Sequence, residues 1–376
     1  MDTHREAATL ARLTDLSFLE WNTVRAPTAS GYEEKVNKFN KWLRDNSIEV
    51  TNEFSLDLAL TEYLEDLYFR GYNHSEGDAL MASLKYFSHA LATARPDPLP
   101  RASRSLRGFR RLAPGCSRAP LPWVAVCAMA GAAVADGSYL FAVALILQFV
   151  CYLRPHELLN LKQHQVVEPV RGSLTSSWSL LLSPQELGRG SKTNQFDESV
   201  LVDWKELPAL NRALKCRKER LLKDDPLWPF EHKEFNKLFV RYSEHSGVHL
   251  LSPHPYSVRH GGASHDALHQ RRPLMEIKAR GRWAADESVR RYNKHSRVLK
   301  EVSRLPEETR EYGMWVMGHL NQLLDQKIKA RQPPELKSKK LRKRKAHPES
   351  DSDAEPATQA PRAGALAGTR LRRRTA

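Results

Sequence analysis

The sequence predicts a mainly α-helical protein with a small β-sheet, built as two domains followed by a disordered basic tail. Apolar residues recur every three or four positions through most of the first 330 residues, which is the spacing of amphipathic helices. Only two short stretches have the composition of strands, and a proline-rich stretch at 113–122 separates two helical regions. A chain of 376 residues has room for two or three domains.

The charge of the chain is strongly positive and unevenly distributed. The formal net charge is +15, but residues 331–376 hold 13 Lys and Arg against 5 Asp and Glu, so +8 belongs to the tail and +7 to the rest. A basic surface of this size favours a polyanionic partner, and nucleic acid is the leading candidate. With 41% hydrophobic residues the body can still bury a substantial core.

Cysteine usage and hydropathy indicate an intracellular protein without a membrane segment. The four cysteines form no C-x-x-C pair, as expected of reduced or incidental thiols: Cys116, Cys127, Cys151 and Cys216. No N-terminal segment has the features of a signal peptide. The apolar stretch 124–153 is interrupted at 136–138, which leaves pieces too short to cross a bilayer, so we expect two buried helices there.

The first domain is expected at residues 21–112, after an N-terminal extension at 1–20 that holds no strong signal. We expect a first helix capped by Thr28 or Ser30, and no alternating strand pattern follows. Three apolar stripes with helical spacing predict an all-helical domain: Tyr32, Val36, Phe39, Trp42 and Leu43; Leu56, Leu58, Leu60, Tyr63, Leu64, Leu67 and Tyr68; Ala79, Leu80, Leu84, Phe87 and Leu91.

A basic ridge with near-helical spacing closes this domain, just before the 113–122 linker. It could be an ordinary solvated helix face, or it could contact phosphates along a DNA duplex. Its members are Arg101, Arg104, Arg107, Arg110 and Arg111.

The second domain is expected at residues 123–330. Two apolar helices, at 124–135 and 139–150, lead into a polar patch, and short strands follow at 177–183 and 198–203 with a polar turn between them. The remaining predicted elements are helices at 205–222, 232–245, 256–269, 273–281, 286–294 and 306–330.

Two patches in this domain hold residues suited to bind and attack a phosphate. The first contains Arg154, and the second contains Arg259, then Gly281 and Trp283, then Tyr292. Arginine is always charged and grips two phosphate oxygens, an indole donates one hydrogen bond, and a phenol can act as a nucleophile. Taken singly, Arg259 could be a surface ion pair, Trp283 a core aromatic and Tyr292 a helix-surface residue. The order and spacing of the set favour a common site.

This order resembles the catalytic half of the tyrosine recombinases, the phage integrase family. The resemblance covers roughly residues 20–325 and implies a helical core-binding domain plus a mixed α/β catalytic domain that together clamp double-stranded DNA. Arg154 and Arg259 match the two arginines that hold the phosphate, and Glu157 either supports that site or caps the next helix. The family's C-terminal helix docks on a neighbouring subunit, so the helix at 306–330 would do this or pack on its own domain.

The resemblance also assigns the chemical steps. Tyr292 matches the nucleophile, which forms a 3′-phosphotyrosyl link, and Trp283 matches the position that donates to a phosphate oxygen. Lys192, in the polar turn, matches the lysine that protonates the leaving 5′ hydroxyl, with Arg189 as the alternative. The implied activity is site-specific recombination or DNA integration by a protein that self-associates, as a tetramer on DNA, without any small-molecule substrate.

One position departs from the family pattern. A histidine is usual three residues before the second arginine, and this chain has Tyr256. A phenol there can still hydrogen-bond to the phosphate or the nucleophile, but it is a poorer general base than an imidazole at neutral pH. His254 is a possible substitute, although Pro253 and Pro255 flank it, and His260 fits a supporting role. The departure leaves open a catalytically weakened, domesticated protein that only binds DNA.

No cofactor or metal is expected. Strand transfer through a phosphotyrosyl link conserves the bond energy, so ATP is not needed, and the chain contains no P-loop. Four histidines lie close together in sequence, but no cysteine accompanies them and their spacing fits no zinc site: His254, His260, His265 and His269. A third possibility, a type IB topoisomerase-like activity, shares the chemistry but not the integrase-like N-terminal domain.

The tail, residues 331–376, has few large apolar residues and is expected to be disordered. A dense basic run in it predicts a nuclear localisation signal or a nonspecific nucleic-acid arm. The nuclear reading would make this a eukaryotic protein derived from a mobile element. The basic residues of the run include Lys339, Lys340, Arg342, Lys343, Arg344 and Lys345.

Overall fold

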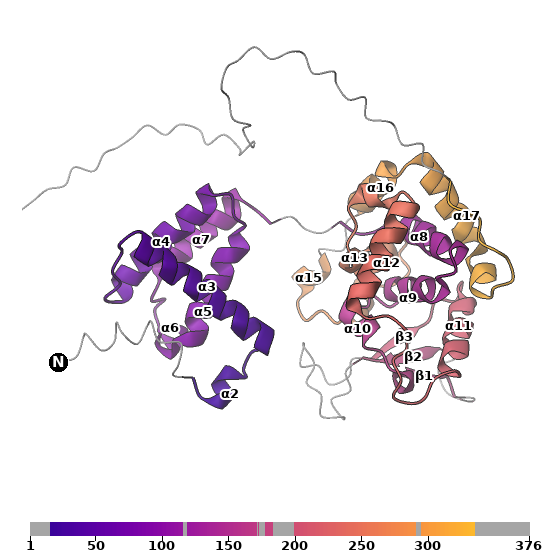
Figure 1. Ribbon diagram of the computed structural model, residues 1–376, viewed down its shortest axis with the longest axis horizontal. Helices are drawn as coiled ribbons and strands as arrows, with labels where there is room; N and C mark the ends of the chain where they lie inside the picture. The colour runs from indigo at the N-terminus through magenta and orange to yellow at the C-terminus, as the bar shows by residue number, and fades with distance from the viewer. Residues whose placement is uncertain are drawn as a thin grey trace, which may run out of the picture. The chain divides into compact units, whose positions relative to one another are not determined.

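The computed structural model describes residues 16–115, 119–170, 172, 177–182, 199–290 and 295–334, which form two compact units (Figure 1). The described residues up to 115 make the first unit, and those from 119 to 334 make the second. The first is helical and the second is helical with one three-stranded sheet, so the predicted fold class is confirmed. The tail beyond residue 334, with its expected nuclear signal, lies outside the described residues.

The helices of the first unit enclose a core made from the predicted apolar stripes. Its buried side chains include Val36, Phe39, Leu60 and Leu64, with helix packed on helix. The elements are α2 (Phe18–Trp21), α3 (Ala26–Asp45), α4 (Glu53–Phe69), α5 (His74–Phe87), α6 (His89–Thr93) and α7 (Pro100–Leu112).

The expected cap of the first long helix was wrong. Helix α3 begins at Ala26, before Thr28 and Ser30, with Arg25 at the N-cap. Pro27 explains the early start, because proline has the helical φ and lacks an N–H that the first turn would leave unbonded.

A carboxylate from another helix caps the N-terminus of α7. The buried Asp57 of α4 accepts hydrogen bonds from the backbone N–H groups of Arg101, at 3.0 Å, and Ala102, at 2.8 Å. The residue at the N-cap itself, Leu99, offers no side-chain acceptor. Asp57 therefore replaces a local cap and fixes the basic helix to the unit that carries it.

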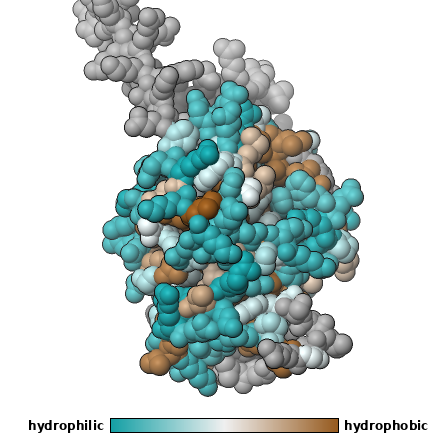
Figure 2. Space-filling view, turned by 90° about the vertical axis from the view of Figure 1, so that its right-hand side faces the viewer, coloured by the Kyte–Doolittle hydropathy of each residue, from teal (hydrophilic) through white to brown (hydrophobic). Residues whose placement is uncertain are grey.

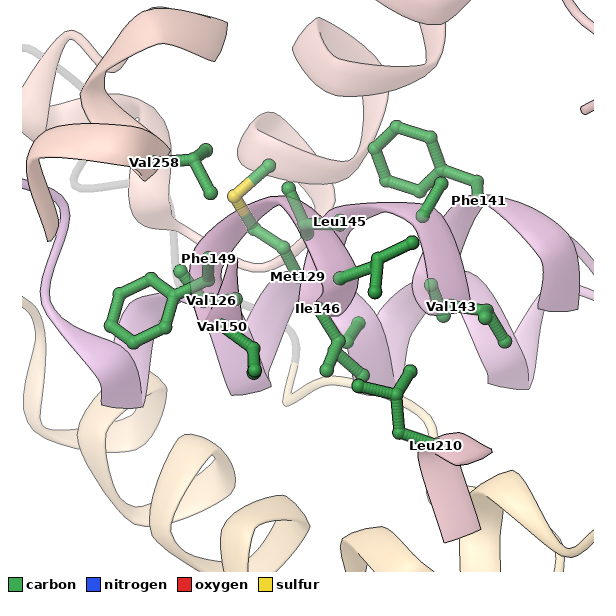
Figure 3. Close-up of a cluster of buried hydrophobic side chains, with 14 of the residues drawn as sticks. Val126, Met129, Phe141, Val143, Leu145, Ile146, Phe149, Val150, Leu210 and Val258 are labelled. Atoms are coloured by element: carbon green, nitrogen blue, oxygen red, sulfur yellow. The ribbon is translucent and has the colours of Figure 1, made fainter. Parts of the chain in front are cut away.

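The centre of the second unit is a pair of apolar helices, α8 (Trp123–Ala135) and α9 (Tyr139–Val150). Side chains from both helices and from their neighbours interdigitate in this core (Figure 3). Helix α13 (Pro255–Leu268) approaches backbone to backbone, since a Cβ on Gly262 would lie 2.0 Å from the carbonyl oxygen of Phe149. This contact fixes α13 against α9, and the candidate site lies where these helices meet.

The sheet contains one more strand than the sequence predicted. Strands β2 (Trp178–Leu181) and β3 (Ser199–Val202) pair antiparallel, with Trp178 opposite Val202, inside the two predicted stretches. The additional strand β1 (Val166–Val167) pairs antiparallel with β2 in the order β1-β2-β3. A two-residue strand has no alternation to detect, which explains the omission.

The other helices of the second unit surround this centre (Figure 1). Helix α17 (Glu307–Leu324) packs on α8 and on α11 (Pro208–Lys218) of its own unit, and Asn321 of α17 donates to the carbonyl oxygen of Glu206 at 2.8 Å. It ends at Leu324, earlier than the expected 330. The elements are α10 (Pro155–Leu159), η1 (Gln163–Gln165), α11 (Pro208–Lys218), α12 (His232–His245), η3 (Val248–Leu251), α14 (Leu274–Gly281), α15 (Asp286–Arg290), α16 (His295–Arg304) and α17 (Glu307–Leu324).

The visible face in Figure 2 is mostly hydrophilic, with apolar residues scattered over it. Among the helices of the described ranges, none has both the length and the hydropathy needed to cross a lipid bilayer.

Candidate active site

Arg154 lies at the turn that follows the core helix α9. Tyr152 takes a left-handed conformation there, with φ of 49°, and Arg154 becomes the N-cap of α10, followed by Pro155 in the first turn. The carboxylate of Glu157 accepts the backbone N–H of Arg154 at 2.7 Å and also pairs with the Arg154 guanidinium. Glu157 was expected either to support the site or to cap the next helix; its carboxylate caps α10 and also pairs with Arg154.

Glu157 is the common partner of three arginines. Besides Arg154, its Oε2 atom lies 2.5 Å from Nη2 of Arg282 and 3.6 Å from Nη1 of Arg259. Burial alone would raise the pKa of Glu157, but the three guanidinium charges outweigh burial and lower it. The carboxylate is thus ionised at neutral pH, and one negative charge faces three positive ones.

Arg259 is completely buried, on the third position after Tyr256 in α13. Its Nη1 donates to the carbonyl oxygen of Tyr152 at 2.5 Å, and its Nη2 donates to that of Gly281. Its Nε has no acceptor within the described ranges. Burial and the charge of Arg282 lower the pKa of Arg259 to about 10, more than Glu157 raises it, so its charge is only partly balanced.

Trp283 packs against this arginine. The centre of its ring lies 4.9 Å from the guanidinium of Arg259, and the ring stacks on Tyr152 with 6.4 Å between centroids. Gly281 makes room for the ring, because a Cβ there would lie 1.9 Å from a carbon of the indole. The position of the Trp283 ring therefore requires a glycine at residue 281.

Tyr256 joins the same group from α13. Burial lowers the pKa of Arg154, but Glu157 and then Tyr256, by charge and hydrogen bonding, raise it above its usual value. The ring of His260 lies 5.3 Å from that of Tyr256. His254 does not occupy the position of the missing base, because its Nδ1 caps α13 by accepting the backbone N–H of Tyr256 at 3.1 Å.

Four of the predicted catalytic residues are thus neighbours: Arg154, Tyr256, Arg259 and Trp283. The other two, Lys192 and Tyr292, lie outside the described residues, as does the alternative Arg189. Arg282 was not predicted as a site residue. Its place between Gly281 and Trp283 was visible in the sequence, but its contact with a glutamate 125 positions earlier was not.

A second ionic network lies behind the site. Asp266 accepts from the phenol of Tyr152 and from Nε of Arg272, at 2.9 Å for the latter, and Asp203 pairs with Arg272 and Arg280. Arg280 also donates to the carbonyl oxygen of Val150 at 2.9 Å. The network holds the turn after α9 and the end of α14 in place, and these two segments carry the site.

The rings of His265 and His269 lie close together, with 4.3 Å between their centroids. His265 lies among aromatic rings, 5.7 Å from that of Phe149 and 5.5 Å from that of Trp204. Burial lowers its pKa to about 3, so it is neutral. Within the described ranges no group of three or more His, Cys, Asp or Glu side chains is placed to hold a metal ion.

The five arginines of the basic ridge lie exposed on α7, opposite the buried Ala102, Leu106 and Phe109. One of them pairs within the unit, because Nε of Arg110 donates to Asp78 at 3.0 Å. The face can therefore meet a polyanion, and nothing in the described unit covers it.

Comparisons with known proteins bear on the fold. No protein-family model matches the chain, and no curated protein matches its sequence. Among solved structures, the chain resembles the Tn1549 transposon integrase in complex with transposon right end DNA, with a TM-score of 0.50 and 16% identity over 81% of this chain and 99% of that one. This similarity confirms that the chain has the tyrosine recombinase fold.

Two further similarities are weaker. The XerA recombinase gives a TM-score of 0.37 at 15% identity, over 81% of this chain and 98% of that one. The XerH site-specific recombinase bound to its difH substrate gives 0.38 at 13% identity, over 76% and 90%.

Proposed function

We propose that this protein is a site-specific DNA recombinase that breaks and rejoins DNA through a 3′-phosphotyrosyl intermediate on Tyr292. The observation that carries the proposal is the position of the buried Arg259 beside Arg154 and Trp283, with its carboxylate partner, Glu157, 3.6 Å away and shared with other arginines. A buried cation that shares its counter-ion is incompletely balanced, and a DNA phosphate at this site would supply further negative charge.

Besides the side chains of this chain, the proposed reaction uses only water, as a proton acceptor. The phenolic oxygen of Tyr292 attacks the phosphorus, the bond from phosphorus to O5′ breaks, and Lys192 or Arg189 gives a proton to O5′. Because position 256 is a phenol, we assign the proton lost by Tyr292 to water. Arg154 and Arg259 stabilise the charge that develops on the phosphate oxygens, the largest contribution expected in such a step. Religation reverses these transfers.

Double-stranded DNA is the proposed partner. The neighbour of similar fold is itself bound to a transposon end, and α7 offers five exposed arginines. We further propose self-association on DNA, as a tetramer, and nuclear targeting through the basic run that ends at Lys345. A sizing column run with and without bound DNA tests the first, and a fluorescent fusion with and without the run tests the second.

The test of the proposal is a suicide-substrate assay with a nicked duplex from the repeats that flank the gene, without metal. Wild-type protein should yield a protein–DNA adduct that survives denaturing electrophoresis, and Tyr292→Phe should yield none while still retarding DNA on a native gel. An adduct that persists in Tyr292→Phe would refute the assignment of the nucleophile.

A second function is favoured by Tyr256. A protein that kept the fold and the phosphate contacts but lost acid–base assistance would bind a DNA site without cutting it. In the same assay such a protein would retard the duplex on a native gel, and neither the wild type nor Tyr292→Phe would give an adduct.

A further inference from the structure

The buried Arg282 has no place in the scheme above, although it touches the centre of the site. It lies at the end of α14 with φ of 54°, a left-handed conformation that glycine adopts with less strain. Its guanidinium donates to the carbonyl oxygen of Arg280 at 2.9 Å and to Oε2 of Glu157 at 2.5 Å. Five other non-glycine residues of the described ranges share this range of φ, so the case for a role of Arg282 rests on the contacts of its side chain.

The two oxygens of Glu157 are divided among its partners. Oε1 pairs with the guanidinium of Arg154, whereas Oε2 accepts from Arg282 and from the backbone N–H of Arg154. Arg259 stands 3.6 Å from Oε2, too far for a normal hydrogen bond, and gives its donors to two backbone carbonyls instead. Arg282 thus donates to Oε2 of Glu157, the carboxylate oxygen that lies nearest to Arg259.

We propose that Arg282 is a positioning residue that serves as the counter-ion of Glu157 and so leaves the charge of Arg259 available to the phosphate. Without it, Glu157 would draw Arg259 closer than the present 3.6 Å, into direct hydrogen-bond contact, because two desolvated opposite charges attract strongly at this distance. The effect of Arg282 on catalysis rests on the proposed function. Its effect on anion binding does not, and the binding of inorganic phosphate tests that effect without catalysis.

The variants separate charge from shape. Arg282→Met removes the charge and keeps much of the length, and Arg282→Lys keeps the charge. Adding Glu157→Gln to Arg282→Met removes the carboxylate that needs a counter-ion. Because residue 157 is then a neutral glutamine, the double variant leaves no buried carboxylate without Arg282, so it should fold if the single variant does not. Arg212→Met is the matched control, because it breaks an arginine–carboxylate pair with Asp325 on the surface of the same unit.

The first measurement is the rise in melting temperature on replacing chloride with inorganic phosphate at equal ionic strength. Wild type, Arg282→Lys and Arg212→Met should be stabilised by phosphate, and Arg282→Met should lose this stabilisation. The double variant with Glu157→Gln should recover it. Absence of phosphate stabilisation in wild type, or its persistence in Arg282→Met, would overturn the inference.

The second measurement is the rate of adduct formation on the nicked duplex. Arg282→Met should form the adduct about 10- to 100-fold more slowly, the range typical when a residue that orients the binding groups is lost, with unchanged DNA affinity. Recovery of the rate in the double variant supports the counter-ion role, and a double variant no faster than Arg282→Met contradicts it. If wild type forms no adduct but the phosphate pattern holds, the proposed recombination fails while the role of Arg282 stands.

Discussion

The guanidinium of Arg259 lies 4.9 Å from the centre of the Trp283 ring, although Arg259 belongs to α13 and Trp283 to the segment between α14 and α15. The ring covers one side of a fully buried cation and stacks with its other neighbour, Tyr152. A guanidinium against an indole face is stabilised by the electrons of the ring. Two residues proposed to meet the same phosphate are therefore already held together before DNA arrives.

The room for this ring depends on Gly281. We expect Gly281→Ala to lower the free energy of unfolding by about 1–3 kcal/mol, as overpacked sites do, and to slow adduct formation, because the new Cβ would lie 1.9 Å from the indole. Denaturant unfolding and the suicide-substrate rate measure the two effects. Gly318→Ala is the control: nothing lies within 4 Å of its added Cβ on the exposed face of α17. It should stabilise by up to about 1 kcal/mol, and equal losses in both variants would argue against the packing account.

The position of Tyr256 predicts a gain of activity. Tyr256→His places an imidazole beside Arg154, where it can take the proton that we assign to water. The rate of adduct formation should rise about 10²-fold or more, the contribution usual for a placed general base. The rate should also become dependent on pH near neutrality. Single-turnover rates between pH 5.5 and 8.5 measure this, and an unchanged, pH-independent rate would show that the phenol does not limit catalysis.

Because His265 is largely buried, we expect the free energy of unfolding to depend on pH. Its pKa in the folded state is lowered from 6.5 to about 3, by burial first and by the neighbouring His269 and Arg271 next. Between these values the unfolded chain binds the proton and the folded chain does not. Stability should therefore fall as the pH drops from about 6.5 toward about 3, by up to about 1.4 kcal/mol for each pH unit.

The variant His265→Phe keeps an aromatic ring at this position and cannot take a proton. Its free energy of unfolding should depend less on pH in this window than that of wild type. His249→Gln changes an exposed histidine and should leave the wild-type slope intact. Equal slopes in His265→Phe and wild type would refute the assignment.

The exposed face of α7 predicts the salt dependence of DNA binding. If Arg104 and Arg107 contact phosphates, the double change to Gln should lower affinity alike on all sequences and reduce the slope of log K against log salt by about 2. Binding isotherms from 50 to 300 mM salt give this slope. Arg70→Gln, at the exposed residue that caps the C-terminus of α4, should leave it unchanged. An unaltered slope in the double variant would remove α7 from the interface.

Local sequence patterns predicted the elements well where apolar periodicity was strong. The helix expected at 232–245 has these bounds in the structure, and the core helices begin or end within one residue of the expected positions. The patterns around Arg154 and Arg259 marked residues that the fold brings to one carboxylate. Short elements and early helix starts were missed because two valines or one proline carry little periodic signal.

The remaining features depend on contacts between distant parts of the chain. The capping of α7 by Asp57 joins residues more than 40 positions apart, and the pairing of Arg282 with Glu157 joins residues 125 positions apart. Neither is visible in a local window. The complete burial of Arg259 was also unforeseen, since an arginine is usually exposed unless it is paired.

The most direct test of the central claim is to identify the residue that carries DNA in the adduct. The adduct from the nicked duplex is digested with nuclease and then with a protease that cuts after glutamate, which releases residues 288–301 as one peptide containing Tyr292 as its only tyrosine. Mass spectrometry should find this peptide carrying a nucleotide through a phosphate on Tyr292. A nucleotide on any other residue, or no adduct on a duplex that the protein demonstrably binds, would contradict the proposed recombinase mechanism.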